Sequence, residues 1–592
     1  MKGRRRIRRH FANTLNHEDT AAMLDPIDET PLRSPVYSSP LEGRKGKMCL
    51  TRRVFMGLPL AASLSAEEAR AGEKAKTFLR LRHAWCPYAL PAETTLQEIE
   101  SVARRGFDAV GVSFVGPYHG GQIDFSTLDA AVELVAKYGA RTVLHLAPRF
   151  SEGDRMGDTL HDGTFLPHVW NRSPNYSVVD LFDPRQRALF FDYLSRVAQR
   201  YGADKRIAGF ALGWGYMGET GFFFGDFLSD FSQIGATCAG YSEHALREFS
   251  RWRTARKLPP LGRLPMPSPE RQSADYIAFQ RFRAEWVRGV FQRGMVGAVK
   301  AHTSAPVGIF GYIAANPNNY ARCWQSTPNA DFYRSAASAS SFDIARTLLD
   351  SGVGWEDAEL HDGKWDFTAA CMRRDEARQI ARGGAFHAMH VRVYKTEPQW
   401  EPDIYDKICA FLKTQTLDRQ LRREPLTIAL YQPTWGAAAL PAQSAKQPFL
   451  PNRAHARHLT KTIGLAESFG LPYRLITEAN LLDPKRLRPY EHLLVPMWDL
   501  LDRVLDADSY RRLAADSRVV KIPLADRPLT RTALRAQLKQ AGIAVRLDFD
   551  ADTVLAGRSS RLVYNWTDAP LTVRVPEIAT PLTLAAHEFR VV

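Results

Sequence analysis

A repeated alternation of short apolar segments with helical ones constrains the fold more than any other feature of this sequence. In the first half of the chain, apolar segments lie at residues 77–84, 108–115, 142–146 and 207–212. The pattern between them predicts helices, one of which spans residues 184–201. Strands that alternate with helices form right-handed βαβ units and a parallel sheet. The sequence therefore predicts an α/β fold.

The alternation continues until the sequence has supplied about eight strands. A long helix over residues 275–301 leads into a fifth strand at 307–312, and residues 342–349 form either a sixth strand or a helix. The seventh and eighth strands are expected at 353–360 and 385–394. About eight such repeats fit a (β/α)8 barrel, or TIM barrel, with insertions. A doubly wound sheet is the alternative at this point.

The length of the chain predicts more than one domain. Its 592 residues exceed what a single hydrophobic core supports, and the composition shifts near residue 422. We expect the barrel over residues 72–422, a second and smaller α/β unit over 425–530, and a C-terminal β-domain over 540–592. Within the β-domain, residues 562–568 and 571–575 are expected to pair as a hairpin.

The amino-terminal residues carry the pattern of an export signal. Thr51–Met56 resembles the twin-arginine motif, an apolar stretch covers residues 54–66, and Ala69–Ala71 is a small-residue cleavage site. This stretch is shorter than the roughly 20 residues that span a bilayer, so no membrane span is expected. We expect a signal peptide over residues 48–71, behind a disordered leader or spurious extension at 1–47, and a periplasmic or secreted mature protein. A buried N-terminal helix is the alternative.

Charge and cysteine usage argue against other functional classes. The net charge is +15, and the run Arg4–Arg9 taken alone would suit a nucleic-acid-binding arm. The rest of the chain shows no nucleic-acid-binding module, so no such partner is expected. The six cysteines form no Cys-x-x-Cys pair, which excludes a zinc-ribbon pattern. His387 and His390 have no matching acid, so no metal and no cofactor are expected.

A glycine-rich stretch after the fourth strand, Gly209–Gly225, supplies the first candidate catalytic residue. It carries one carboxylate, Glu219, among the aromatic residues Trp214, Tyr216 and Phe222–Phe224. A carboxyl group among aromatic rings keeps its proton near neutral pH, because desolvation disfavours the charged form. A general acid acting on a sugar needs that property, and barrels place their chemistry at the carboxyl ends of strands. The alternative is a solvated glycine-rich loop.

Several segments are similar to one known family. They are Ile123–Asp129, Arg200–Gly202 with Ile207–Phe210, Phe279–Phe282, and Tyr564–Asp568 with Leu582–Leu584. Together with the order of the parts, they resemble glycoside hydrolase family 42, the bacterial β-galactosidases, over residues 78–592. The resemblance implies a catalytic (β/α)8 barrel, a flavodoxin-like trimerisation domain at 425–530, a short C-terminal β-domain and a carbohydrate substrate. It also implies a homo-oligomer, a trimer.

One departure from the family concerns the acid/base residue. In family 42 this Glu directly follows an Asn at the end of strand four, whereas Gly218 precedes Glu219 here. The local arrangement looks more like the glycine-rich turn of the β-amylases. The resemblance therefore brings the acid/base role to Glu219 but not the specificity for galactose.

A second carboxylate is expected near the seventh strand, because glycoside hydrolysis usually needs two carboxyl groups. In the enzymes that the chain resembles, the nucleophile lies at the end of that strand. Glu359, followed by Trp365 and Arg373–Arg374, matches the family pattern best. Glu356, which directly follows the apolar run, is the alternative. A solvated acidic loop is the non-catalytic interpretation of the same segment.

Aromatic and polar residues near the predicted strand ends are candidate sugar contacts. They are Trp85, His119, Trp214, Tyr216, Asn316, Trp355 and Tyr394. The sequence thus predicts an exported glycoside hydrolase acting on an oligo- or polysaccharide, with Glu219 as the acid and Glu359 or Glu356 as its partner. The main alternative is an exported barrel that binds carbohydrate without cleaving it. An exported metalloenzyme is a weaker alternative.

Overall fold

The computed structural model covers the chain in segments. It describes residues 83–86, 92–114, 117–119, 121–146, 149–150, 156–167, 179–214, 222, 235–313, 329–337, 354–357, 387–388, 404–414, 426–525, 529–545, 554–556, 562–565, 569–575, 578–586 and 588–591. The leader and signal peptide predicted at 1–47 and 48–71 lie outside these residues.

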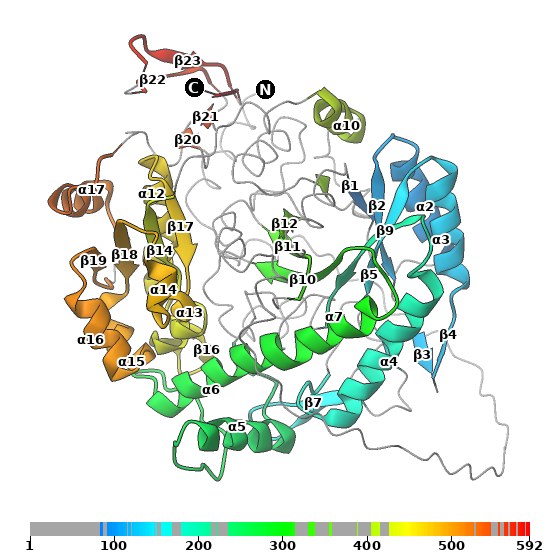
Figure 1. The fold of residues 1–592 in the computed structure, drawn as a ribbon, viewed down its shortest axis with the longest axis horizontal. Helices are drawn as coiled ribbons and strands as arrows, with labels where there is room; N and C mark the ends of the chain where they lie inside the picture. The colour runs from blue at the N-terminus through cyan, green and yellow to red at the C-terminus, as the bar shows by residue number, and fades with distance from the viewer. Residues whose placement is uncertain are drawn as a thin grey trace, which may run out of the picture.

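An eight-stranded parallel sheet forms the centre of the larger part of the molecule, drawn in blue to green in Figure 1. Its strands are β1 (His83–Cys86), β2 (Ala109–Phe114), β5 (Arg141–Leu146), β9 (Ile207–Leu212), β10 (Val307–Ile313), β11 (Phe332–Ala337), β12 (Gly354–Asp357) and β13 (His387–Ala388). Each strand pairs with the next in chain order as far as β12, and β13 pairs with β1. The last strand therefore returns beside the first, as in a sheet that curls into a barrel.

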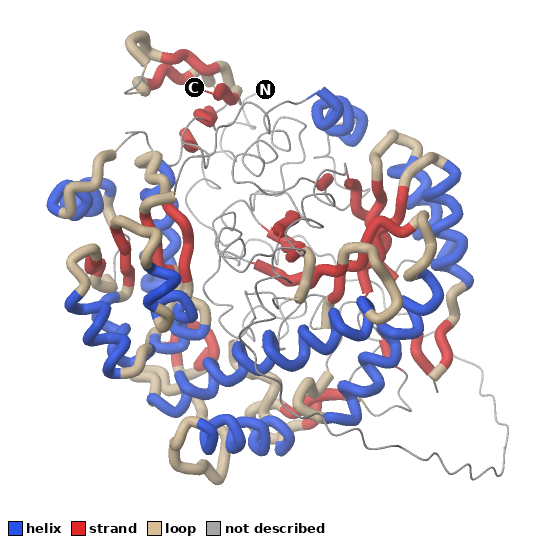
Figure 2. The backbone as a smooth tube through the Cα atoms, in the orientation of Figure 1, coloured by secondary structure: helices blue, strands red, loops and turns tan. Residues whose placement is uncertain are grey.

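Helices follow the barrel strands and cover the outside of the sheet, as Figure 2 shows in blue. They are α2 (Ala92–Ala103), α3 (Ser126–Lys137), α4 (Pro184–Tyr201), α5 (Glu243–Ala255), α6 (Ala274–Trp286), the π-helical η5 (Val287–Gln292), α7 (Arg293–Lys300) and α10 (Ile404–Thr414). Helix α4 begins where predicted because the Asp183 carboxylate caps its first turn and Pro184 takes the first helical position. No helix in the described part of the chain is long and apolar enough to cross a membrane.

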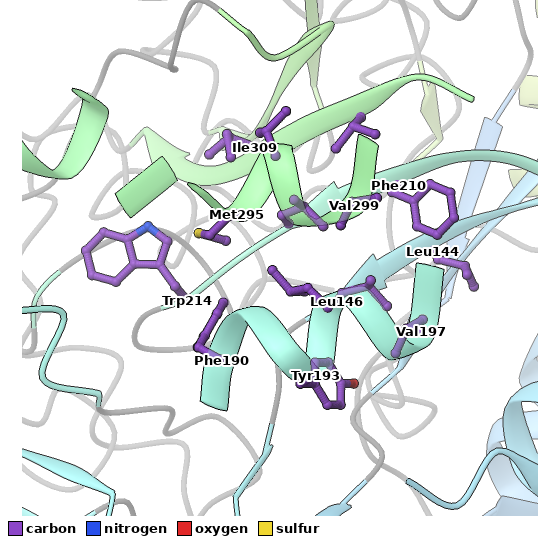
Figure 3. Close-up of a cluster of buried hydrophobic side chains, with 14 of the residues drawn as sticks. Leu144, Leu146, Phe190, Tyr193, Val197, Phe210, Trp214, Met295, Val299 and Ile309 are labelled. Carbon is purple, nitrogen blue, oxygen red and sulfur yellow. The ribbon is translucent and has the colours of Figure 1, made fainter. Parts of the chain in front are cut away.

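The main core lies between the sheet and helices α4 and α7. Figure 3 shows Leu144, Leu146 and Phe210 from the strands against Phe190 of α4 and Val299 of α7. All five side chains are buried. Because side chains alternate across a strand, this cluster fixes which strand positions face the helices and which face the barrel interior.

The predicted strands at 108–115, 142–146, 207–212 and 307–312 are confirmed as β2, β5, β9 and β10. Strands β12 and β13 lie inside the segments predicted for the seventh and eighth strands. Residues 342–349, expected to form either the sixth strand or a helix, lie outside the described residues. The structure places the sixth strand earlier in the chain. It is β11, which pairs with both β10 and β12. Its sequence, Phe-Tyr-Arg-Ser-Ala-Ala, has only a short apolar start, so apolar patterning missed it.

A second parallel sheet forms the yellow and orange unit of Figure 1. Its strands are β14 (Ile428–Tyr431), β17 (Tyr473–Ile476), β18 (His492–Pro496) and β19 (Val519–Ile522). They lie in the order β17-β14-β18-β19, which is 2-1-3-4 in chain order. Helices of this unit include α12 (Arg453–Ser468), α13 (Glu478–Leu481), α16 (Ala507–Ala515) and α17 (Arg531–Gln540). Buried clusters cover both faces of the sheet, as in doubly wound folds.

The carboxyl-terminal strands belong to two small antiparallel sheets. One contains β20 (Val554–Ala556), β21 (Leu562–Asn565) and β24 (Phe589–Val591), and the other contains β22 (Leu571–Val573) and β23 (Leu582–Leu584). The predicted hairpin between 562–568 and 571–575 is therefore wrong. The buried Asn565 explains the change of sheet, because its side-chain amide donates to the Ala569 and Ala585 carbonyls at 2.8 and 2.9 Å.

Candidate functional site

The register of the barrel strands assigns positions to the two faces of the sheet. Residues in register across neighbouring strands form a row. Leu212 of β9 is in register with Ile309 of β10. The same row continues to Tyr333 of β11 and Trp355 of β12. Leu212 and Ile309 are buried in the core cluster that includes α4 and α7. Neighbouring positions in parallel strands share a face. The row that ends at Trp355 is therefore the helix-facing row.

The next row toward the carboxyl end contains one of the predicted catalytic residues. Glu356 of β12 is in register with Arg334 of β11, and Arg334 is in register with Phe310 of β10. Since rows alternate between faces, this row belongs to the barrel interior. Strand β12 ends one residue later, at Asp357. Glu356 therefore holds an interior-face position at the carboxyl end of the seventh strand, where barrels place catalytic groups.

The remaining predicted site residues are only partly covered. Trp85 of β1 is in register with Gly111 of β2. The next residue of β2, Val112, packs in the helix-side core, so Gly111 and Trp85 hold positions on the interior face. His119 ends the short strand β3 (Pro117–His119), which pairs with β4 (Gln122–Ile123) and β6 (Arg149–Phe150) beyond the end of β2. The other predicted residues lie outside the described part of the chain: Tyr216, Glu219, Asn316, Glu359 and Tyr394.

Trp214 is the predicted sugar contact whose side chain the structure describes. It exposes 2% of its surface, and its ring meets Phe222 and Phe291 edge-on at centroid distances of 5.5 and 5.7 Å. It follows Leu212 by two residues and joins the helix-side cluster shown in Figure 3. The indole Nε1 has no hydrogen-bond partner. These described contacts are those of a core residue, and a role in sugar binding stays a prediction.

Phe222 belongs to the same core cluster as Trp214. It exposes 2% of its surface and stacks on Phe182 at 6.0 Å, with 10° between the ring planes. Gly240 packs against it so closely that an added Cβ would lie 2.9 Å from the Phe222 ring. The segment that carries Glu219 in the sequence therefore starts at one buried aromatic residue, Trp214, and ends at another that touches it.

A buried polar cluster lies beside these aromatic residues, and sequence reasoning did not find it. Asp158, Asp180 and Arg283 are each at most 3% exposed. Burial, with the Asp180 carboxyl nearby, raises the pKa of Asp158 well above its usual range, while the Thr159 N–H and the Arg283 charge oppose the shift. Burial also raises the pKa of Asp180, against hydrogen bonds from Ser242 and the Phe182 N–H. No motif or spacing marks these residues, which come from three separate segments.

The second α/β unit reaches the same loops of the barrel. Strand β16 (Gln447–Pro451) lies beside residues 235–241, where the Phe449 N–H donates to the Gly235 carbonyl at 3.0 Å. The Phe449 ring meets the His161 ring at 4.8 Å. The loops that follow β5 and β9 are therefore packed partly by side chains from the second unit.

The described residues contain no cluster of three or more His, Cys, Asp or Glu side chains that could hold a metal ion. Glu356 and, from the sequence, Glu219 and Glu359 are the carboxylates assigned to the relevant strand ends.

Comparison with solved structures defines the class of fold as a TIM-barrel glycoside hydrolase fold. The β-galactosidase from the psychrophilic Marinomonas ef1 superposes with a TM-score of 0.59 and 10% identity, over 86% of this chain and 99% of that chain. The β-galactosidase from Bacillus circulans sp. alkalophilus superposes with a TM-score of 0.59 and 12% identity, over 87% of this chain and 99% of that chain. Gan42B, a GH42 β-galactosidase, superposes with a TM-score of 0.56 and 10% identity, over 86% of this chain and 97% of that chain.

The chain therefore resembles the family 42 β-galactosidases in fold, at low sequence identity, as its segments predicted. No known family profile matches its sequence. No curated protein matches it either.

Proposed function

We propose that the protein is an exported glycoside hydrolase that cleaves glycosidic bonds in an oligo- or polysaccharide with two carboxyl groups. The observation that carries the proposal is the position of Glu356 on the interior face at the carboxyl end of the seventh strand. Glu219 supplies the second group, and in the sequence it lies between Trp214 and Phe222, whose rings meet at a centroid distance of 5.5 Å. The fold resemblance to β-galactosidases supports the same reading.

In the proposed reaction, Glu219 gives its proton to the glycosidic oxygen as the bond from that oxygen to the anomeric carbon breaks. The partner carboxylate, Glu356 or Glu359, either bonds to the anomeric carbon or takes a proton from the water that attacks it. In the first case, water later displaces the carboxylate and returns a proton to Glu219. A carboxyl separation of about 5–5.5 Å gives retention, and about 6.5–9.5 Å gives inversion. No cofactor enters either route.

The strand register gives Glu356 an interior-face position, and this supports Glu356 as the partner. Glu359, which lies outside the described residues, fits the family pattern better in sequence. Separate Glu356→Gln and Glu359→Gln variants distinguish them. Loss of kcat by about 10²-fold or more in Glu356→Gln, with Glu359→Gln near wild type, would support the register assignment. The reverse result assigns the role to Glu359.

Other parts of the proposal concern location and assembly. The twin-arginine pattern supports export to the periplasm or the medium, and no nucleic-acid partner is proposed. The 2-1-3-4 strand order of the second unit is that of the first four strands in flavodoxin-like sheets. We propose that this unit is the trimerisation-type domain of the family that the chain resembles.

The alternative is an exported barrel that binds carbohydrate without cleaving it, because Gly218 stands where the resembled family has Asn. A panel of nitrophenyl glycosides, the β-galactoside included, separates the two functions. Wild type should hydrolyse at least one of them, and Glu219→Gln should lower kcat by about 10²- to 10⁴-fold. Glu243→Gln, whose side chain is 91% exposed on α5, is the control and should leave kcat unchanged. Oligosaccharide binding without hydrolysis by any variant would establish the binding protein instead.

A further inference from the structure

Arg334 of β11 holds the position beside Glu356 on the interior face of the barrel. The two residues are in register, and in the described strands their row consists of Phe310, Arg334 and Glu356. Strands β10, β11 and β12 are hydrogen-bonded neighbours, shown in green in Figure 1. Adjacent strands of a sheet run about 4.8 Å apart. The backbone therefore places a cationic and an anionic residue next to each other near the carboxyl ends of two strands.

The interior row that precedes this pair is apolar. Phe332 lies two residues before Arg334, so the two positions share a face. Phe332 is fully buried, and its ring packs so closely on Gly308 of β10 that an added Cβ there would lie 2.4 Å from a ring carbon. Gly354 of β12 continues the same row. Toward the amino end of the barrel, the row of Arg334 and Glu356 is thus bordered by a row without polar side chains.

Opposite charges at neighbouring positions suit such a place. The interior of a TIM barrel is filled mainly by bulky apolar residues, and an isolated charge taken out of water is costly unless an opposite charge is near. Arginine stays protonated, and a positive charge within a few ångströms favours the ionised form of a carboxyl group. The other ionisable residues at interior-face positions of the described strands lie in other rows: His83, Arg141, His145, Tyr312 and His387.

We propose that Arg334 holds Glu356 as a carboxylate, so that Glu356 enters the proposed reaction as the nucleophile or base and not as the acid. This inference rests on the proposed function and on Glu356 as the partner carboxylate. Arg334 is a positioning residue in this scheme, because it acts on the reaction through the charge of Glu356.

The amino end of β11 offers a matched control. Asp331, directly before the strand, is 1% exposed and accepts from the Lys300 ammonium group at 3.0 Å and from the Val307 N–H at 2.9 Å. This ion pair lies at the end of the barrel where residues serve stability. Lys300→Met therefore removes a cation beside the same strand but leaves the row of Glu356 intact.

The first test is the pH profile of kcat/KM on an aryl glycoside that wild type cleaves. Its acid limb reports the group of the free enzyme that must be ionised. Arg334→Met should move this limb upward by about one to two pH units, and Arg334→Lys, which keeps the charge, should move it less. Lys300→Met should leave the limb in place, because a smaller amount of folded enzyme lowers the plateau only.

Two results of this test overturn the inference. If the acid limb of Arg334→Met stays where it is in wild type, Arg334 does not set the charge of the reacting carboxyl group. If KM rises while the limb stays in place, Arg334 contacts the substrate instead.

Urea denaturation at pH 7 tests the pairing without any activity. The change in midpoint caused by Arg334→Met should be more unfavourable in the wild-type background than in Glu356→Gln, which has no negative charge to leave unpaired. Lys300→Met should change the midpoint equally in both backgrounds. Equal changes for Arg334→Met overturn the inference. If wild type cleaves no glycoside, the proposed function fails, and this comparison supports or refutes the pairing by itself.

Discussion

The barrel and the second α/β unit each bury an ionisable side chain on a helix, Arg283 of α6 and Glu478 of α13, but they satisfy it differently. In the second unit, Glu478 is fully buried and its Oε1 accepts from the Tyr431 hydroxyl and from the Thr434 and Gly436 N–H groups at 2.8–2.9 Å. The Thr434 hydroxyl donates to the other oxygen. In the barrel, Arg283 has one carbonyl, a thiol and a ring face.

The contacts of Glu478 all lie inside one unit. Its donors belong to Tyr431 at the end of β14 and to the turn that follows, so the carboxyl group connects this part of the chain to helix α13. An added Cβ at Gly436 would lie 2.5 Å from Oε1, which leaves no room for another group. Arg283 instead connects helix α6 to Phe222, Cys238 and Ala239, which lie between β9 and α5, and its Nε–H has no hydrogen-bond partner.

Truncation of the satisfied charge should have the largest effect on stability. Glu478→Ala leaves four buried or partly buried donors without an acceptor, so we expect the second unit to lose roughly 3 kcal/mol of unfolding free energy. Urea denaturation of the full chain, with hydrogen exchange in residues 426–525, measures this loss. Glu478→Gln keeps an acceptor oxygen and should lose about 1 kcal/mol. Equal losses in the two variants would mean that the hydrogen bonds do not explain the stability.

A smaller effect is expected from Phe222→Leu, which keeps an apolar side chain but removes the ring under Arg283. Loss of the cation–π contact and of the stacking on Phe182 should cost about 2 kcal/mol. Urea denaturation of the full chain measures this loss, and an unchanged denaturation midpoint would mean that neither ring contact stabilises the barrel.

The pH dependence of stability should differ between two acids of the same loop region. Burial and Asp180 raise the folded-state pKa of Asp158 above 3.8, so the unfolded chain ionises first as the pH rises and wild type loses stability above about pH 3.8. Asp158→Asn removes this loss. As the pH rises, the unfolding free energy of the variant should therefore increase relative to that of wild type, by at most about 1.4 kcal/mol per pH unit. Urea midpoints between pH 3 and 7 measure the trend.

Asp162 is the control for that trend and should show the opposite sign. The Thr164 N–H lowers the pKa of this exposed carboxyl, so its contribution is present above 3.8 and is lost as the pH falls through the lowered value. Asp162→Asn should therefore be slightly less stable than wild type at neutral pH and equal to it in acid. Parallel curves for the two variants would contradict the assignment of a raised pKa to Asp158.

The smallest effect is expected from Trp214→Phe, which keeps an aromatic ring in the core. If Trp214 only bounds the Glu219 segment, KM should change by less than about twofold while kcat falls modestly. If the indole contacts the sugar, as the sequence predicts, KM should rise with kcat nearly unchanged. Steady-state kinetics on one aryl glycoside distinguishes the two roles of this buried ring.

Apolar patterning was sufficient wherever the signal was local. The strand at Ile207–Leu212 is buried at every position, and the helix at Pro184–Tyr201 carries its own cap and initiating proline, so both were predicted to the residue. Glu219 was selected from the sequence because it follows an apolar strand among aromatic residues, Glu359 because it fits the family pattern, and Glu356 as the alternative because it directly follows the apolar run. The interior-face position of Glu356 could not be predicted, since it depends on the register between β11 and β12.

The sequence by itself thus determined the alternation of strands and helices, the division into units and the candidate carboxylates, because those depend on residues close together in the chain. The tertiary structure decided that β11 is the sixth strand, that β21 and β22 enter different sheets, and that Trp214 is covered by Phe222 and Phe291. It also revealed Arg283, whose sulfur partner lies 45 residues away. Burial and pairing arise between segments distant in sequence, and only packing brings such segments together.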